Sequence, residues 1–407
     1  MMTIFPRAIL PEIRKYLDTD DVVVLHGARQ VGKTHILYAL RDELRAAGRA
    51  THYIDLEDSR FVRLLDSGVG SFLDHLSEEG VQATKGEERV FVFIDEIQYL
   101  ADPSSFLKLI ADHHRRVKLI VSGSSSFAIR DKFRDSLVGR TVDFEIFPLR
   151  FDEFLVFKGR AGEAENARTA VRIDELRGLF REFVLYGGYP KVVLTPGIER
   201  KEKYLQQIID TYVRKDIRDL ARIADIGKFN RLVEVLASQS GQLLNVAEVS
   251  STIRLAKPTV ERHLFLLENT YILRLVRPFS GNVRSELTKM PKVFFFDTGL
   301  LQMLWLKGLQ KEVLGPVFET AIFAELVKRY GRESVLYWRT KDRREIDFIV
   351  RDRRRVLPIE AKVRYEQFSP AACRFFAKKY EGAEPYRVVA LEGVPEDDRH
   401  SIRPWEL

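Results

Sequence analysis

The sequence has little cysteine and no long apolar run. Its one cysteine is Cys373, so no disulfide can form within the chain, which is typical of proteins from a reducing compartment. No stretch approaches the roughly 18 apolar residues that a membrane-spanning helix needs. The first residues, MMTIFPRAILPEIRKYL, lack the apolar core and the small-residue cleavage site of a signal peptide. We therefore expect a cytoplasmic protein that does not contact membranes.

The composition is that of a globular protein with a basic surface. Hydrophobic residues make up 45% of the 407 residues, which is enough to bury a sizeable core. At roughly 100–200 residues per domain, the length suggests two to four domains. A formal net charge of +7 favours acidic partners, above all nucleic acid.

Residues 1–150 alternate short apolar runs with amphipathic stretches. Four runs indicate buried strands: VVVL (22–25), THYIDL (51–56), VFVFI (90–94) and KLIV (118–121). This alternation predicts an α/β fold, in which helices cover both faces of a parallel sheet. From 151 to 222 the pattern is wholly helical, with one break at GGYP (187–190).

A phosphate-binding motif follows the first of these strands. GARQVGKT fits G-x-x-x-x-G-K-T between a strand and a helix, which is the context that the motif requires. Backbone N–H groups and the helix dipole would bind the phosphates of ATP, Lys33 would reach the β- and γ-phosphates, and Thr34 would ligate Mg²⁺. The predicted nucleotide-binding residues are Gly27, Ala28, Arg29, Gln30, Val31, Gly32, Lys33 and Thr34.

Two carboxylates end the strand FVFID. Asp95 is predicted to hold Mg²⁺, and Glu96 to orient and deprotonate the attacking water. The next strand ends in VSGSSS, where Ser124, or else Ser122, could touch the γ-phosphate, although a plain serine-rich turn fits nearly as well. Arg140 could stabilise transition-state charge in its own subunit or in a neighbour, or lie on the surface without such a role.

These motifs resemble, in order, those of a known family. After GARQVGKT come IDLED, FIDEIQ, VSGSSS, LVGR, PLRFDEF, YGGYP, YVRKDI, RPFSGN and KMPKVFFFDTGLL. The sequence resembles a bacterial and archaeal family of AAA-type ATPases with a C-terminal domain of unassigned function. The resemblance implies four parts: an AAA+ core (1–150), a helical lid (151–224), a winged helix (225–300) and a restriction-endonuclease-like domain (301–407).

Three helical stretches between 226 and 272 fit a helix-turn-helix. The third, KPTVERHLFLLENTYI, has an apolar stripe at Val260, Leu264, Leu267 and Ile272, and is expected to expose Lys257, Thr259, Arg262 and His263. Such positions enter the major groove in DNA-binding examples, and Arg274, Arg277 and Arg284 would lie in the following wing. A winged helix that contacts only protein remains the alternative.

The C-terminal part carries a nuclease-like pattern. Asp347 lies in the strand EIDFIV, Glu360 and Lys362 lie in LPIEAKV, and Glu319 lies on a preceding helix. Two carboxylates and a lysine at this spacing look like the PD-(D/E)xK nuclease core, which binds Mg²⁺ or Mn²⁺. Either an active nuclease or a nuclease-derived scaffold without cleavage fits, and we favour the scaffold.

The combined prediction is an enzyme, an ATPase that assembles as a homo-oligomer, most simply a hexameric ring, and acts on duplex or branched DNA. The alternative is a signalling or defence switch, in which the nucleotide controls an effector that acts on a protein partner. Intact Lys33, Asp95 and Glu96 argue against a version without hydrolysis.

Overall fold

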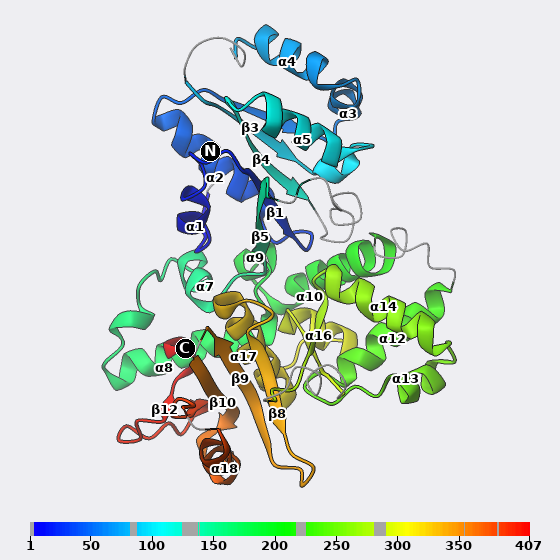
Figure 1. Ribbon diagram of the computed structural model, residues 1–407. Helices are drawn as coiled ribbons and strands as arrows, with labels where there is room; N and C mark the ends of the chain where they lie inside the picture. The colour runs from blue at the N-terminus through cyan, green and yellow to red at the C-terminus, as the bar shows by residue number, and fades with distance from the viewer. Residues whose placement is uncertain are drawn as a thin grey trace. The chain divides into compact units, whose positions relative to one another are not determined.

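The computed structural model describes residues 4–81, 88–123, 137, 139–216, 225–280, 290–353, 355–380 and 382–407. Its contacts divide the chain into two compact units, Met1–Phe147 and Pro148–Leu407. Each unit has a sheet of its own (Figure 1). Each also has its own cluster of buried hydrophobic side chains. No helix in the described ranges is long and apolar enough to cross a membrane.

The first unit is built on a five-stranded parallel sheet. Its strands run in the order β2 (Thr51–Asp55), β3 (Val90–Asp95), β4 (Val117–Gly123), β1 (Val22–Gly27), β5 (Thr141–Ile146). The four strands expected from apolar runs are confirmed, and every residue of β1, β3 and β4 is buried. Because the strands are parallel, the residues that follow β1, β3 and β4 meet at one edge of the sheet.

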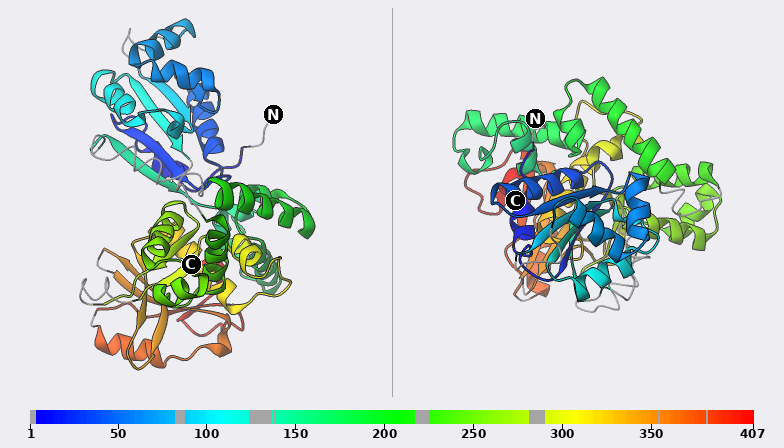
Figure 2. Two further views of the ribbon diagram at one scale, coloured as in Figure 1. Left: turned by 90° about the vertical axis from the view of Figure 1, so that its right-hand side faces the viewer. Right: turned by 90° about the horizontal axis from the view of Figure 1, so that it is seen from above.

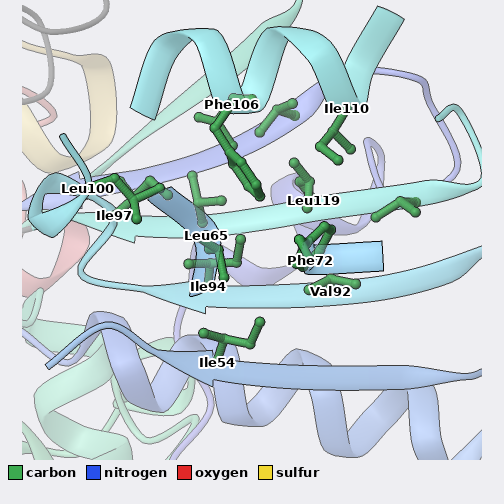
Figure 3. Close-up of a cluster of buried hydrophobic side chains, with 14 of the residues drawn as sticks. Ile54, Leu65, Phe72, Val92, Ile94, Ile97, Leu100, Phe106, Ile110 and Leu119 are labelled. Carbon is green, nitrogen blue, oxygen red and sulfur yellow. The ribbon is translucent and has the colours of Figure 1, made fainter. Parts of the chain in front are cut away.

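Helices cover both faces of this sheet, as Figure 2 shows for the first unit. α2 (Lys33–Ala46) packs on one face, where it contacts β1, β2, β3 and β4. On the other face α3 (Ser59–Asp66), α4 (Val69–Glu78) and α5 (Pro103–His113) bury a shared cluster, in which Phe106 and Ile110 point toward the strands (Figure 3). Asp58 and Asp102 cap α3 and α5, which fixes where these helices begin. The short elements are α1 (Leu10–Arg14) and η1 (Ile97–Tyr99).

The second unit begins with helices. They are α7 (Phe151–Phe157), η2 (Ala164–Asn166), α8 (Ala170–Tyr186), α9 (Pro190–Leu194), α10 (Ile198–Ile208) and the π-helical η3 (Ile209–Asp216). The predicted break at GGYP is confirmed between α8 and α9. There the buried carboxylate of Asp297 accepts N–H groups from Gly188 at 2.8 Å and Leu300 at 2.9 Å. A side chain on Gly187 would collide with this carboxylate, so glycine is required.

The stretch predicted to form a helix-turn-helix contains three helices and a two-stranded antiparallel sheet. The elements are α12 (Ile226–Ser238), α13 (Val246–Ile253), α14 (Lys257–Asn269), β6 (Leu273–Val276), β7 (Lys292–Phe295) and then α16 (Thr298–Trp305). The stripe predicted for α14 is buried, since Val260, Leu264 and Leu267 are each 3% exposed or less.

A second five-stranded sheet follows α17 (Gly315–Tyr330). Its order is β12 (Ser401–Ile402), β11 (Arg387–Glu392), β10 (Arg355–Arg364), β9 (Glu345–Asp352), β8 (Val335–Arg339). β8, β9 and β10 are antiparallel, whereas β11 runs parallel to β10. α17 contacts β8, β9 and β10, and α18 (Ala371–Lys379) buries Cys373 and Phe376 in a second cluster with Trp338. The remaining short elements are η4 (Tyr365–Gln367) and η5 (Pro404–Glu406).

Candidate functional site

The loop between β1 and α2 has the geometry of a phosphate-binding loop. Gly32 has a left-handed backbone, φ 97°, directly before α2, and no side chain caps the first turn of that helix. Its N–H groups and the helix dipole therefore favour an anion at this end. Gly27 has no room for a side chain, because a Cβ would collide with the carbonyl oxygen of Ile146. The predicted glycines thus lie where a phosphate would approach the backbone.

Lys33 lies inside this loop and is buried. Its amine donates to the carbonyl oxygens of Gly27 at 3.1 Å and Ala28 at 2.9 Å. Burial lowers the pKa of Lys33, although Glu96 and Asp95 oppose that shift. The amine's partners are neutral carbonyls, so anionic phosphate oxygens could replace them with a gain in electrostatic energy.

Asp95 is the centre of a hydrogen-bond network at the same edge of the sheet. Its Oδ2 accepts from Thr34 Oγ1 at 2.6 Å and from the hydroxyl of Tyr53 at 3.0 Å. Its Oδ1 accepts from the hydroxyl of Ser122. The predicted Mg²⁺ residues Thr34 and Asp95 are therefore adjacent although they lie 61 positions apart. An aspartate and a threonine hydroxyl are oxygen ligands that fit Mg²⁺.

Glu96 follows directly and has an unusual backbone. Its φ of 57° and ψ of 47° are left-handed, which costs a non-glycine residue about 1–2 kcal/mol. Strained residues of this kind concentrate at functional sites. Gln98 donates a side-chain hydrogen bond to the Glu96 carboxylate, and the Glu96 N–H lies 3.4 Å from Ser122 Oγ. These contacts fix the orientation of the predicted general base.

The remaining predictions for this site concern Ser124, Ser122 and Arg140, and their outcomes differ. Ser124 lies outside the described residues. Ser122, the second choice, bonds to Asp95 and thus orients the carboxylate. Arg140 precedes β5, whose first residue, Thr141, lies opposite Val22 at the start of β1.

Arg140 is therefore at the amino end of β1, while the phosphate loop follows its carboxyl end. Six residues of strand span about 20 Å, so Arg140 does not reach the phosphate loop of its own chain in this structure. It pairs instead with Asp112, at 2.6 Å, near the end of α5. A role in its own subunit is not supported, and a role in a neighbour stays a prediction.

On α14, three of the four residues expected at the surface are accessible. Lys257 and Arg262 are exposed and Thr259 is partly exposed. His263 was expected to be exposed, and that expectation is wrong: it is buried, with its ring 5.3 Å from that of Phe229. The reason is helical spacing, because position 263 is three residues after the core residue Val260 and shares its face. Burial, and then Arg262, lower the pKa of His263.

Ion pairs reduce the positive charge of this predicted DNA surface. Lys257 lies 3.8 Å from Glu261, one turn along α14. Arg274 contacts Glu268 at 3.4 Å and Glu333 at 2.7 Å. Arg277 is partly exposed, and Arg284 lies outside the described residues.

The four residues of the nuclease-like pattern do converge. Ile359 pairs with Phe348, which places Glu360 opposite Asp347 in the adjacent strands. The Lys362 amine contacts Asp347 Oδ2 and Glu360 Oε2, both at 2.6 Å. Burial and then Asp347 raise the pKa of Glu360 to about 8.

Glu319 joins the cluster from α17, together with a lysine that the sequence did not suggest. Lys292 contacts Glu319 at 3.3 Å and Glu345 at 2.5 Å. Burial, and then Asp347, raise the pKa of Glu319 to about 7. Within the described ranges, no three His, Cys, Asp or Glu side chains are grouped so as to hold a metal ion. In this arrangement the carboxylates of the cluster are paired with lysines of the chain.

Comparison with protein families accounts for most of the chain in three successive parts. Residues 19–155 match an AAA domain, and residues 314–404 match a domain of unknown function (DUF4143). The chain thus combines a region that matches an AAA domain with a C-terminal region that matches DUF4143. Between the two, residues 177–312 match another domain of unknown function (DUF8612). The Lys33 and Asp95 sites thus lie in the AAA domain, and Asp347 and Glu360 lie in the DUF4143 domain.

Similar proteins occur in bacteria and archaea. An uncharacterized protein of Haemophilus influenzae is 27% identical over 360 residues, 86% of this chain and 84% of that protein. One from Methanocaldococcus jannaschii is 23% identical over 357 residues, 84% of this chain and 75% of that protein. Among solved structures, DnaA from Aquifex aeolicus bound to AMPPCP (16% identity, 63% of this chain, 86% of that chain) has a TM-score of 0.28. Thermotoga maritima RuvB (14%, 67% and 90%) has a TM-score of 0.34, so both likenesses are loose.

The sequence did not suggest three residues that contact the site, two of which lie in the AAA domain. Tyr53 of β2 donates to Asp95, and Gln98 donates to Glu96. A third, Arg7, is buried and donates to the carbonyl oxygens of Val31 in the phosphate loop, at 2.7 Å, and of Phe147, at 2.9 Å. For Tyr53 a signal existed, because a tyrosine near the end of a strand beside β3 can reach the carboxylate at its end.

Tyr53 provides a test of the Asp95 network. Tyr53→Phe removes one of the donors that orient Asp95 and should raise the Mg²⁺ concentration needed for tight ATP binding by about tenfold, the lower range for residues that orient metal ligands. Binding of a fluorescent ATP analogue at varied Mg²⁺ measures this requirement. Affinity without Mg²⁺ should stay unchanged. Tyr16→Phe, in a ring that packs on Phe144, is the control. An identical Mg²⁺ requirement in Tyr53→Phe and the parent would contradict the role.

Proposed function

We propose that this protein is an ATPase that binds ATP with Mg²⁺ at the phosphate loop of its AAA domain and hydrolyses it. The observation that carries the proposal is the convergence on Asp95, where hydroxyls from α2, β2 and β4 bond one carboxylate beside Lys33 and Glu96. The AAA-domain match supports it. An accidental glycine-rich turn would not bring these six residues together.

Each residue has a distinct task in this proposal. Lys33 exchanges its carbonyl partners for phosphate oxygens and so fixes the phosphates. Thr34 and Asp95 would hold Mg²⁺, which neutralises charge on the phosphates when bound. Glu96, oriented by Gln98, accepts the proton of the attacking water.

The site lacks a cation opposite Lys33 among the residues predicted for catalysis. Arg140 is remote from its own phosphate loop, so in this proposal it acts on the nucleotide of a neighbouring subunit. That role requires a homo-oligomer, for which a hexameric ring is the simplest closed arrangement. ATP hydrolysis would then be controlled by contact between subunits.

The second part of the proposal is an association with DNA through α14. Lys257, Thr259 and Arg262 lie at accessible positions on the helix that would enter a groove. One observation favours the alternative of a nucleotide-controlled switch that binds a protein: Phe265, on the same helix, is 52% exposed. Large exposed aromatics are typical of protein interfaces. We propose that the DUF4143 domain serves either partner as a nuclease-derived scaffold without cleavage.

Two substitutions separate binding from hydrolysis. Lys33→Ala should abolish tight ATP binding, because the amine that contacts the phosphates is lost. Glu96→Gln should bind ATP but hydrolyse it about 100-fold more slowly or worse, as loss of a general base predicts. Nucleotide binding and phosphate release measure the two steps. Undiminished turnover in Glu96→Gln would remove Glu96 from the role of base.

Mixing of variants tests the role of Arg140. Arg140→Ala should bind ATP and lose hydrolysis by about 1,000-fold, and mixing it with Glu96→Gln should restore part of the rate at hybrid interfaces. Asp112→Ala is a matched control, since it breaks the same exposed ion pair but keeps the arginine. If subunits demonstrably mix and no activity returns, Arg140 does not act between subunits.

DNA association has its own test. Lys257→Ala with Arg262→Ala should weaken DNA binding and reduce its salt dependence by about two counterions, if both contact phosphates. Lys228→Ala with Arg231→Ala removes the same charge from α12 and serves as the control. The measurement is the affinity for single-stranded, duplex and branched DNA at several salt concentrations, together with the ATPase rate. Equal loss in both double variants would indicate general electrostatics, and no loss would favour the protein-binding alternative.

A further inference from the structure

A buried lysine enters the acid cluster of the DUF4143 domain from another part of the chain. Lys292 is 3% exposed and is the first residue of β7. Its amine contacts Glu319 of α17 at 3.3 Å and Glu345 of β9 at 2.5 Å. Lys292 belongs to the range that matches DUF8612, whereas both glutamates belong to the DUF4143 range. The nuclease-like cluster is therefore completed by a residue outside its own domain.

The charges of the cluster are nearly balanced by side chains. Lys362 contacts Asp347 and Glu360, while Arg339 contacts Glu345 at 2.9 Å. With Lys292 and Glu319, three cations thus face four carboxylates. Burial alone would lower the pKa of Lys292, but Glu319, Glu345 and Asp347 outweigh it and raise that pKa. The lysine is therefore charged at neutral pH.

One oxygen of Asp347 and one of Glu360 already have donors within the chain. Asp347 Oδ2 accepts both from Lys362, at 2.6 Å, and from the N–H of Ala361, at 2.9 Å. Mg²⁺ demands near-octahedral oxygen ligands at about 2.1 Å and keeps several waters, so it would have to displace these donors. No group of three or more His, Cys, Asp and Glu side chains that could hold a metal ion lies in the described ranges.

The backbone also holds Lys292 in this position. Val293, the next residue of β7, accepts the N–H of Gly241 at 2.7 Å and donates to the carbonyl of Gln242 at 3.1 Å. On its other side β7 pairs with β6. Gly241, with φ +83°, approaches Glu319 so closely that a Cβ would lie 3.2 Å from its carboxylate. Withdrawal of the lysine would therefore disturb a strand that is bonded on both sides.

We propose that Lys292 is the resident cation of this cluster, which takes the place of a divalent metal ion and stabilises the packing of β7 against the DUF4143 domain. The carboxylates are retained because they bind lysines. A metal ion binds there only when the charge of Lys292 is removed. This inference is independent of ATP hydrolysis.

Mn²⁺ binding to the full-length, nucleotide-free chain tests this inference. Lys292→Met removes the charge but keeps an unbranched side chain, and should create a site for about one Mn²⁺ per chain, because Glu319 loses its cation and four carboxylates then face only two cations. Electron paramagnetic resonance of free Mn²⁺ counts the bound ions. Each protein is compared with the same protein carrying Asp347→Asn, so that only the cluster is counted. The parent should show no difference between the two.

Matched variants decide between the outcomes. Lys292→Arg keeps the charge and should bind no Mn²⁺ at the cluster, and Lys341→Met, at an exposed lysine, should behave as the parent. Lys292→Gln replaces Lys292→Met if the latter fails to fold by circular dichroism and gel filtration. The proposal is overturned if the parent binds an Mn²⁺ ion that depends on Asp347. It is also overturned if a folded variant without the Lys292 charge binds no Mn²⁺ at the cluster.

Discussion

The predicted nucleotide site depends on one carboxylate, whose hydroxyl donors come from α2, β2 and β4. Asp95 accepts hydroxyl groups from Thr34, Tyr53 and Ser122. These residues meet only because the strands are parallel and in register, so that Asp55 lies opposite Asp95 and Leu25 opposite Ser122. Burial of β1, β3 and β4 on both faces stabilises that register, since a slip would expose apolar side chains. Packing far from the phosphates thus determines the position of the predicted metal ligand.

In the second unit, buried charged side chains likewise determine which elements lie next to one another. Removing a carboxylate from water is costly unless donors replace the water, so each buried acid specifies its neighbours. Asp297 joins the start of α16 to the glycines between α8 and α9 through Gly188 and Leu300. Lys292 joins β7 to α17 and β9 in the same way. Two of the sequence motifs shared with the AAA-type family, YGGYP and KMPKVFFFDTGLL, therefore meet in space for an electrostatic reason.

The sequence predicted most elements because apolar periodicity is local. Strands β1 to β4 and the helices α12, α13 and α14 follow from runs and stripes of a few residues. The phosphate loop was predictable because its glycines, lysine and threonine are consecutive. Contacts between residues far apart in the sequence could not be predicted in this way. Tyr53 lies 42 residues from Asp95, Lys292 lies 27 from Glu319, and the position of Arg140 at the far end of β1 depends on strand order. His263 was predicted to be exposed because its side chain is polar, but its helical position places it on the buried face.

The two candidate sites differ in what their charged groups already bind. Lys33 bonds to two neutral carbonyl oxygens, so a phosphate offers it a stronger, ionic partner and entry of the ligand is favourable. Lys362 and Lys292 already bond to carboxylates, so a metal ion must break existing ion pairs in a buried setting before it gains any ligand. Residue types that suit a ligand are therefore not sufficient for a site. The partners that those residues already have also matter: Lys33 contacts neutral carbonyl oxygens, whereas Lys292 and Lys362 contact carboxylates.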